Sequence, residues 1–236
     1  MDDKNKKAIS DLLKAYSLLV RGIESDANSS SDRAYGGVIR AGKGILVESI
    51  AKKLVEIAWR ELGKKQKKIS LERRAVKIPL KKEYLERIKN QEIRDYIKNN
   101  IGNYCYFLKT DVHVYANGRF AMAIECKAYA ENAMLKRILV DFTLLKQIYP
   151  DLSFVLFQLE SQLGGDYSKI AKIHYGSCST HTLLSYFDID LHIITLLEGE
   201  RKVDQPIHKK SHYKELTRES LLAAVEVFKG ILNKYP

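Results

Sequence analysis

The sequence predicts a mixed α/β (α+β) fold in which helices flank a small, central mixed β-sheet. Two observations support this class. Apolar residues recur at three- and four-residue intervals near both ends of the chain, whereas between residues 104 and 128 they alternate with polar residues. A short apolar run at 153–159 then follows a helical stretch. The resulting order of helices, hairpin, helix and strand is expected of a sheet covered by helices.

The first hundred residues are predicted to be mainly helical. Apolar periodicity predicts a helix over residues 4–23, and the polar segment at 24–37 predicts a loop. A second helix is expected from residue 38 or 42 to residue 62, where Gly63 is a natural stop. Another, highly charged helix is expected over residues 81–99.

The middle of the chain is predicted to carry the sheet. Strands at 104–116 and 119–128 are joined by the turn dipeptide Asn117-Gly118. The later elements are a helix at 131–148, strands at 153–159 and 189–197, and a helix at 217–234. We therefore expect a single domain over residues 1–236, with a helical part at about 1–100 and a sheet core at about 101–200.

Charge points to a polyanionic partner. The chain has a formal net charge of +11, which indicates nucleic acid or an anionic surface. Residues 64–82 alone hold nine Lys or Arg residues against the single acid Glu72. This segment is either a solvated loop between helices or an arm that follows phosphates.

The cysteines and the apolar segments of the chain predict its cellular compartment. Three cysteines at scattered positions form no recognisable disulfide framework, so we expect a reducing compartment. The first residues include no apolar segment of a secretory signal, and no apolar run approaches membrane-spanning length. The prediction is a cytoplasmic protein without a membrane partner.

Asp111, Glu125 and Lys127 form the most informative pattern. They lie on the two predicted strands of the hairpin, on either side of the Asn117-Gly118 turn. Two convergent carboxylates can hold a divalent cation, and a nearby ammonium can orient water and balance negative charge. Metal-assisted attack on a phosphodiester needs these groups. The alternative is that the three side chains line the solvated face of a half-buried hairpin.

The hairpin register tests this interpretation. With a two-residue loop, Asp111 opposes Ile124, and the two carboxylates lie on different faces. A three-residue loop, or an equivalent bulge, places both carboxylates on one face. The same register gathers an apolar set on the other face, made of Val112, Val114, Met122, Ile124 and Cys126. Because hydrophobic burial and assembly of the site require the same register, we predict the longer loop or the bulge.

With these residues, the chain resembles the PD-(D/E)XK nuclease superfamily, and within it the Type II restriction endonucleases. The resemblance rests on Asp111, Glu125 and Lys127, on the helix and apolar strand that follow them, and on Glu48 in an N-terminal helix. Thr110 stands where the family often has proline, which is not a ligand. The resemblance implies a restriction-endonuclease-like sheet flanked by helices.

The resemblance also implies site roles. Asp111, Glu125 and the carbonyl of Cys126 would bind Mg²⁺, and Lys127 would position the attacking water and stabilise charge on the phosphate. Glu48 either holds a metal-bound water or Lys127, or is an ordinary exposed glutamate. No nucleotide cofactor is expected.

The implied substrate is double-stranded DNA, cut at a specific sequence by a homodimer whose two-fold symmetry matches a palindromic site. Candidate DNA-binding residues come from the segments at 30–43 and 64–82. They are Arg33, Tyr35, Arg40, Lys43, Lys64, Lys65, Lys67, Lys68, Arg73 and Arg74. The rival interpretations are a structure-specific DNA repair or junction nuclease, and a non-catalytic nucleic-acid-binding protein.

Two further patterns carry weaker predictions. From Gly37 the chain matches the start of a phosphate-binding loop, but Gly44 replaces the Ser or Thr that reaches magnesium and no apolar strand precedes it. The helix start there could still bind a DNA phosphate. His174, Cys178 and His181 are close in sequence, but a fourth zinc ligand is not apparent, which favours a structural role.

Overall fold

The computed structural model describes residues 1–27, 33–169, 175–207 and 209–236. Five strands form the central sheet in the order β1-β4-β5-β6-β7. They are β1 (Ile69–Glu72), β4 (Val112–Ala116), β5 (Arg119–Glu131), β6 (Ser153–Gln162) and β7 (Leu191–Thr195). Neighbours β1, β4 and β5 are antiparallel, while β5, β6 and β7 are parallel. The predicted mixed sheet is therefore confirmed.

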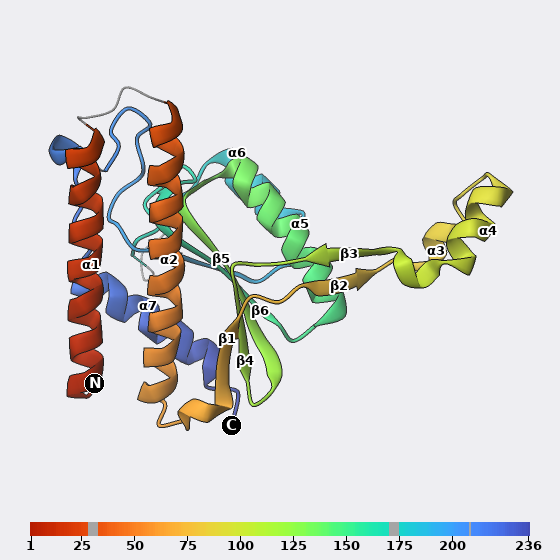
Figure 1. Cartoon of the computed structure of the whole chain (residues 1–236), viewed down its shortest axis with the longest axis horizontal. Coiled ribbons are helices and arrows are strands. Elements are labelled where there is room, and N and C mark those ends of the chain that lie inside the picture. Colours follow the sequence, from red (N-terminus) through yellow and green to blue (C-terminus); the bar gives the residue numbers. More distant parts are fainter. Residues whose placement is uncertain (28–32, 170–174, 208) are drawn as a thin grey trace.

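Helices cover both faces of this sheet, as Figure 1 shows. On one face, α1 (Asp3–Ala27), α2 (Arg33–Glu61) and α7 (Arg218–Leu232) share an apolar core with β4, β5 and β6. On the other face, α5 (Asn132–Ile148) packs its buried leucines and Phe142 against Phe154 and Leu156 of β6. The short helix α6 (Cys178–Ser185) lies beside α5. Burial of apolar surface on both sides holds the sheet in place.

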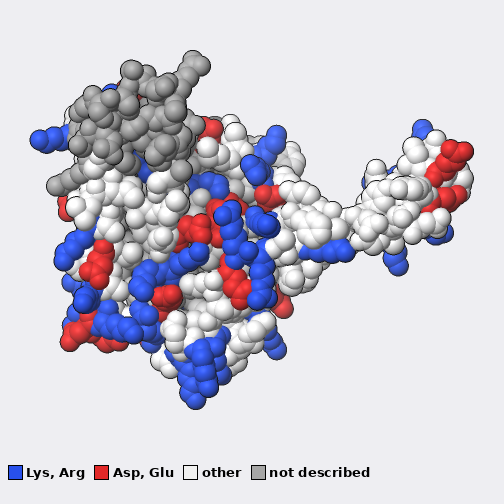
Figure 2. Space-filling view, in the orientation of Figure 1, with Lys and Arg blue, Asp and Glu red and all other residues white. Residues whose placement is uncertain are grey.

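A slender projection leaves the body between β1 and β4 (Figures 1 and 2). Its base is a two-stranded antiparallel ribbon of β2 (Val76–Pro79) and β3 (Cys105–Leu108). Its tip carries α3 (Lys82–Leu85) and α4 (Gln91–Asn99). We call residues 76–108 the arm.

In the hairpin of β4 and β5, a two-residue turn and a bulge together produce the predicted alternation of faces. Its loop has only two residues, Asn117 and Gly118, both with positive φ (52° and 77°), as a type I′ turn requires. One extra residue then bulges from β5 where the register shifts between Val114 and Tyr115. Of the two predicted alternatives, the three-residue loop is wrong and the bulge is confirmed. The apolar set joins the core under α2.

Several predicted boundaries were wrong. Helix α1 extends to Ala27 and α2 already begins at Arg33, so most of the expected loop at 24–37 is helical. The first hundred residues also contain β1 and β2. The expected helix at 81–99 is split into α3 and α4, and the expected strand at 104–116 is split into β3 and β4. These breaks create the arm, which local periodicity does not show.

The glycine-rich stretch from Gly37 to Gly44 lies inside α2 and is not a loop. Its backbone N–H groups are therefore used by the helix and are not gathered around a phosphate, which corrects the expectation of a phosphate site at this helix start. Within the described ranges, no helix combines the length and the apolar character needed to cross a membrane.

Candidate active site

Two strands bring the predicted catalytic residues together. Asp111 immediately precedes β4, while Glu125 and Lys127 lie on β5. Because Val112 pairs with Ile124, Asp111 comes level with Glu125 across the antiparallel pair. The ammonium of Lys127 lies 3.2 Å from Asp111 Oδ2, 2.5 Å from Glu125 Oε2 and 3.2 Å from the carbonyl oxygen of Cys126. Three oxygens from both strands thus converge on one point.

Backbone and side-chain contacts hold Asp111 in this position. The N–H of Cys126 donates to Asp111 Oδ2 over 2.8 Å. The other carboxylate oxygen, Oδ1, lies 3.7 Å from the guanidinium of Arg73. Arg73 leaves the sheet directly after β1, whose last residue Glu72 pairs with His113. The pairing of edge strand β1 with β4 therefore places the guanidinium of Arg73 beside the cluster.

The burial of the cluster shapes its protonation. Burial raises the pKa of Glu125 to about 7, and the charge of Asp111 adds to this rise, while Lys127 opposes it. Burial works to lower the pKa of Lys127, but the two carboxylates outweigh it and leave the pKa above its usual value. Lys127 therefore stays charged at neutral pH, and a further cation beside Glu125 would favour its ionised form.

The oxygens at the cluster are suited to a hard divalent cation such as Mg²⁺. Two carboxylates and one backbone carbonyl are hard donors, and Mg²⁺ binds through few protein oxygens and keeps several waters. Among the described residues, no group of three or more His, Cys, Asp or Glu side chains could hold a metal. A closed, all-protein cage of the kind used for structural zinc is thus absent from the described ranges.

Glu48 stands apart from the three oxygens. In the described part of the chain its carboxylate pairs with Lys52, one turn further along α2, at 2.6 Å. Helix α2 packs on the sheet face that carries Cys126, and the charge of Glu48 contributes to the raised pKa of that buried thiol. Strand alternation turns Glu125 and Lys127 to the other face. Glu48 therefore lies on the Cys126 side of the sheet and has no direct contact with the cluster among these residues.

The predicted DNA-binding residues separate into groups. Lys64 is used internally, because its ammonium donates to the carbonyls of Leu232 (2.9 Å) and Asn233 (3.3 Å) at the end of α7. Burial lowers the pKa of Lys43, which is half-buried in α2. Three lysines remain exposed beside β1, namely Lys65, Lys67 and Lys68. The side chains of Arg33, Tyr35 and Arg40 lie outside the described part of the structure.

Arg73 and Arg74 differ although they are neighbours. Arg73 faces Asp111, whereas Arg74 pairs with Glu72 and lies over the ring of Tyr115, 5.6 Å from its centroid. Both side chains are more than half exposed. The basic run at 64–82 had no feature that could separate them. Only the pairing of β1 with β4 shows which arginine reaches the cluster.

Asp141 is a further acid that the sequence did not single out. Burial raises its pKa, and the charges of Arg137 and Lys127 oppose the rise. Helix α5 packs on the sheet face of Ala123, which by strand alternation is also the face of Glu125 and Lys127, so Asp141 belongs to an element on the side of the cluster. Its only local signal was an acid within the apolar pattern of a helix.

Of the weak zinc pattern, His174 lies outside the described residues, and His181 is bonded to the carbonyl of Tyr175.

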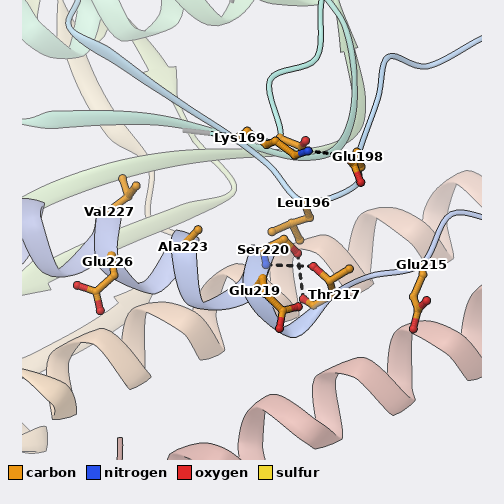
Figure 3. Close-up of a pocket in the computed structure, with 11 residues that line it drawn as sticks. Lys169, Leu196, Glu198, Glu215, Thr217, Glu219, Ser220, Ala223, Glu226 and Val227 are labelled. Atoms are coloured by element: carbon orange, nitrogen blue, oxygen red, sulfur yellow. Dashed lines mark hydrogen bonds and ion pairs between the residues drawn. The ribbon is translucent and has the colours of Figure 1, made fainter. Parts of the chain in front are cut away.

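A hollow of about 590 Å³ at the start of α7 contains none of the candidate residues. Figure 3 shows its glutamates, with Lys169 paired to Glu198 at 2.5 Å and Thr217 bonded to Ser220. The acidic lining is Glu198, Glu215, Glu219 and Glu226. This surface would repel the phosphates of DNA, so it does not compete with the cluster as a nuclease site.

Known proteins supply the remaining comparison. No protein-family model matches the chain. The chain is 48% identical over 228 residues to "Type II restriction enzyme DdeI" of Desulfomicrobium norvegicum, and the match covers 94% of this chain and 95% of that protein. Identity at this level over nearly all of both chains accompanies a mixed sheet flanked by helices and a carboxylate–lysine cluster on its central hairpin. The chain belongs to the Type II restriction endonucleases.

Proposed function

We propose that the chain cuts double-stranded DNA at a specific sequence and that Asp111, Glu125 and Lys127 perform the hydrolysis with Mg²⁺. The observation that carries the assignment is the convergence of two carboxylates and the Cys126 carbonyl on the ammonium of Lys127. Membership of the Type II restriction endonucleases supports the reaction class and disfavours a repair nuclease or a non-catalytic binding protein. Function is assigned from this site and not from the fold.

In the proposed mechanism, Asp111, Glu125 and the Cys126 carbonyl would hold the ion. Bound there, Mg²⁺ would supply positive charge next to the phosphate and would make a neighbouring water more acidic. Lys127 has three N–H donors, so it can hold the attacking water with one while another remains on a carboxylate. The water oxygen forms a bond to phosphorus as one P–O ester bond breaks. The attacking water gives up a proton to solvent, and the departing alkoxide oxygen takes a proton from solvent. Lys127 stabilises the negative charge that develops on the phosphate oxygens.

Arg73 is proposed to contact the phosphate beside the cluster. Its guanidinium is exposed and only 3.7 Å from Asp111 Oδ1, so a phosphate bound at the ion would come within its reach. The exposed lysines beside β1 would bind phosphates further along the backbone. Arg33, Tyr35 and Arg40 remain candidates for contacts with DNA. Glu48 would act indirectly, through water, from the neighbouring helix.

The working enzyme is proposed to be a homodimer in the cytoplasm, acting on a palindromic site without a nucleotide cofactor. Two-fold symmetric DNA is matched most simply by two copies of one chain related by a two-fold axis. Each copy would then cut one strand with its own cluster.

Digestion of a long natural DNA tests this proposal. With Mg²⁺ the protein should produce discrete bands, and with a chelator in place of the metal it should produce none. Lys127→Ala should bind DNA but cut at least about 10²–10³ times more slowly, the usual loss when a charge-stabilising donor is removed. Lys7→Ala, at an exposed lysine of α1, is the matched control.

Two results would contradict the proposal. A Lys127→Ala protein that cuts at the wild-type rate would remove the lysine from catalysis. A smear of fragments of all lengths would contradict sequence-specific cutting.

A further inference from the structure

The arm exposes apolar side chains that its own fold leaves uncovered. Five large side chains between residues 84 and 107 are at least half exposed, namely Tyr84 (50%), Ile93 (53%), Tyr96 (64%), Tyr106 (57%) and Phe107 (61%). Figure 2 shows that much of the arm surface between the body and the tip carries no charged side chain. Exposed apolar and aromatic side chains gathered on one projecting element often mark an interaction site.

Helix α4 shows the same feature most clearly. It has nine residues, none of which is buried. Isolated helices shorter than about 12–15 residues are marginal in water, so most helical stability comes from packing of an apolar face. Ile93, Tyr96 and Ile97 lie three and four residues apart and form such a face. This face has no partner in the described part of the chain that buries it.

The apolar surface continues to the base of the arm. A hollow of about 770 Å³ lies there, between the ribbon and α5. Its lining includes Leu80, Tyr84, Tyr104, Tyr106 and Ile148. Tyr84 and Tyr106 therefore belong both to the hollow and to the exposed set. The surface available to a partner extends from the tip to the body.

The charge of the tip argues against DNA as its occupant. Residues 82–99 contain five basic and four acidic side chains, a net charge of +1. Residues 64–74 contain six basic side chains and one acid, a net charge of +5. A surface that follows phosphates is expected to be strongly basic, like the second segment. A charge-balanced, aromatic surface instead fits a protein partner.

We propose that the occupant is the arm of a second copy of this chain. Two α4 helices packed antiparallel about a two-fold axis would bring the Ile93 and Tyr96 faces together. The acidic start of each helix, at Glu92, would lie near the basic end of the other, at Lys98. Two chains of net charge +11 repel each other, and a tip of net charge +1 adds little to this repulsion.

This inference rests on the proposed homodimer and names the surface that forms it. The test is the mass of the full-length protein in solution, measured by sedimentation equilibrium over a range of concentrations. The double variant Ile93→Ser/Tyr96→Ser replaces only exposed side chains, so the body of the protein should fold. Its circular dichroism spectrum should differ from that of the wild type by no more than the loss of the nine residues of α4. The control Leu18→Ser alters an apolar side chain of α1 that is 75% exposed and lies off the arm.

The expected result is a wild-type protein and a Leu18→Ser control with twice the chain mass of 27.1 kDa. The arm variant should dissociate at least about 100-fold more readily, since a few central aromatic and aliphatic contacts dominate most interfaces. At concentrations high enough for the arm variant to dimerise, it should cut DNA at the wild-type rate per dimer. That result would show that its cluster is intact.

Three results would overturn the inference. If the arm variant stays dimeric, the arm is not the interface, although the proposed homodimer stands. If the arm variant stays dimeric but binds DNA more weakly, the arm contacts DNA instead. If the wild-type protein is monomeric both free and on DNA, the homodimer and its interface both fail. The catalytic assignment is tested separately by Lys127→Ala.

Discussion

The cluster and the arm depart from the usual distribution of residues in opposite directions. The cluster buries charge: Glu125 is only 9% exposed, and Lys127 and Asp111 are mostly covered. The arm exposes apolar groups, with Tyr96 and Phe107 more than 60% accessible. Charged groups are rarely buried unless they are paired, and large exposed apolar patches are rare on isolated proteins. Both regions therefore indicate binding.

The cluster and the arm differ in where the groups that stabilise them come from. In the cluster, Lys127 donates to both carboxylates and Arg73 lies beside Asp111, so two cations offset two carboxylates within one chain. That balance lets the site form before metal or DNA arrives. On α4, the apolar face finds no cover within the described residues. The arm thus depends on another molecule, whereas the cluster depends on the chain that carries it.

The largest expected effect is at the cluster. Asp111→Asn keeps the size of the side chain and its bond from the Cys126 N–H but removes the negative charge. We expect DNA cleavage to fall by about 10³-fold or more, because both the hard ligand and the charge balance are lost. Mg²⁺ binding, measured by calorimetry, should weaken in parallel. Asp11→Asn on α1 is the control, and unaltered metal binding by Asp111→Asn would exclude it as a ligand.

The second effect separates buried from exposed aromatic residues. Phe142 is fully buried in α5 and its ring centroid lies 4.9 Å from that of Phe154. Phe142→Ala should lower the free energy of unfolding by about 3–5 kcal/mol, as truncation of a core phenylalanine does. Phe107→Ala on the arm should change it by less than about 0.5 kcal/mol, measured by urea denaturation at low protein concentration. Equal losses would show that the arm is packed within the monomer.

The third effect divides two adjacent arginines. Arg73→Ala should slow cleavage by about 10–100-fold through loss of a charge-assisted contact at the cluster. Arg74→Ala should have a much smaller effect, because that guanidinium is already engaged by Glu72 and the Tyr115 ring. Arg73→Lys should restore part of the rate, because an ammonium keeps the charge but lacks the paired N–H donors that a guanidinium can offer a phosphate. Single-turnover rates at saturating protein provide the comparison, and equal losses for both alanine variants would reduce Arg73 to a general phosphate contact.

The smallest effect is expected at Glu48. Its carboxylate pairs with Lys52 on its own helix, so Glu48→Gln should lower the cleavage rate by less than about tenfold. The rate should be measured at several Mg²⁺ concentrations. A loss comparable to that of Asp111→Asn would place Glu48 among the groups that hold the ion. Lys52→Met, which removes the pairing partner, shows how much of any loss comes from the pair alone.

Much of the fold could be predicted from local patterns. The helix at 131–148 and the strand at 153–159 correspond to α5 and β6, because apolar periodicity is a property of neighbouring residues. The bulge in the hairpin could be predicted because burial of one face and convergence of two carboxylates require the same register. The meeting of Asp111, Glu125 and Lys127 followed from that argument.

The remaining features depended on contacts between distant parts of the chain. Which of two adjacent arginines reaches Asp111 is set by the pairing of β1 with β4, about forty residues away. Lys64 is bonded to the end of α7, and nothing near it in sequence indicated this. The arm arose because β3 pairs with β2 and not with the central sheet. Periodicity identifies an element and the face it buries, but the choice of neighbour is a competition among distant segments, and only the folded chain decides it.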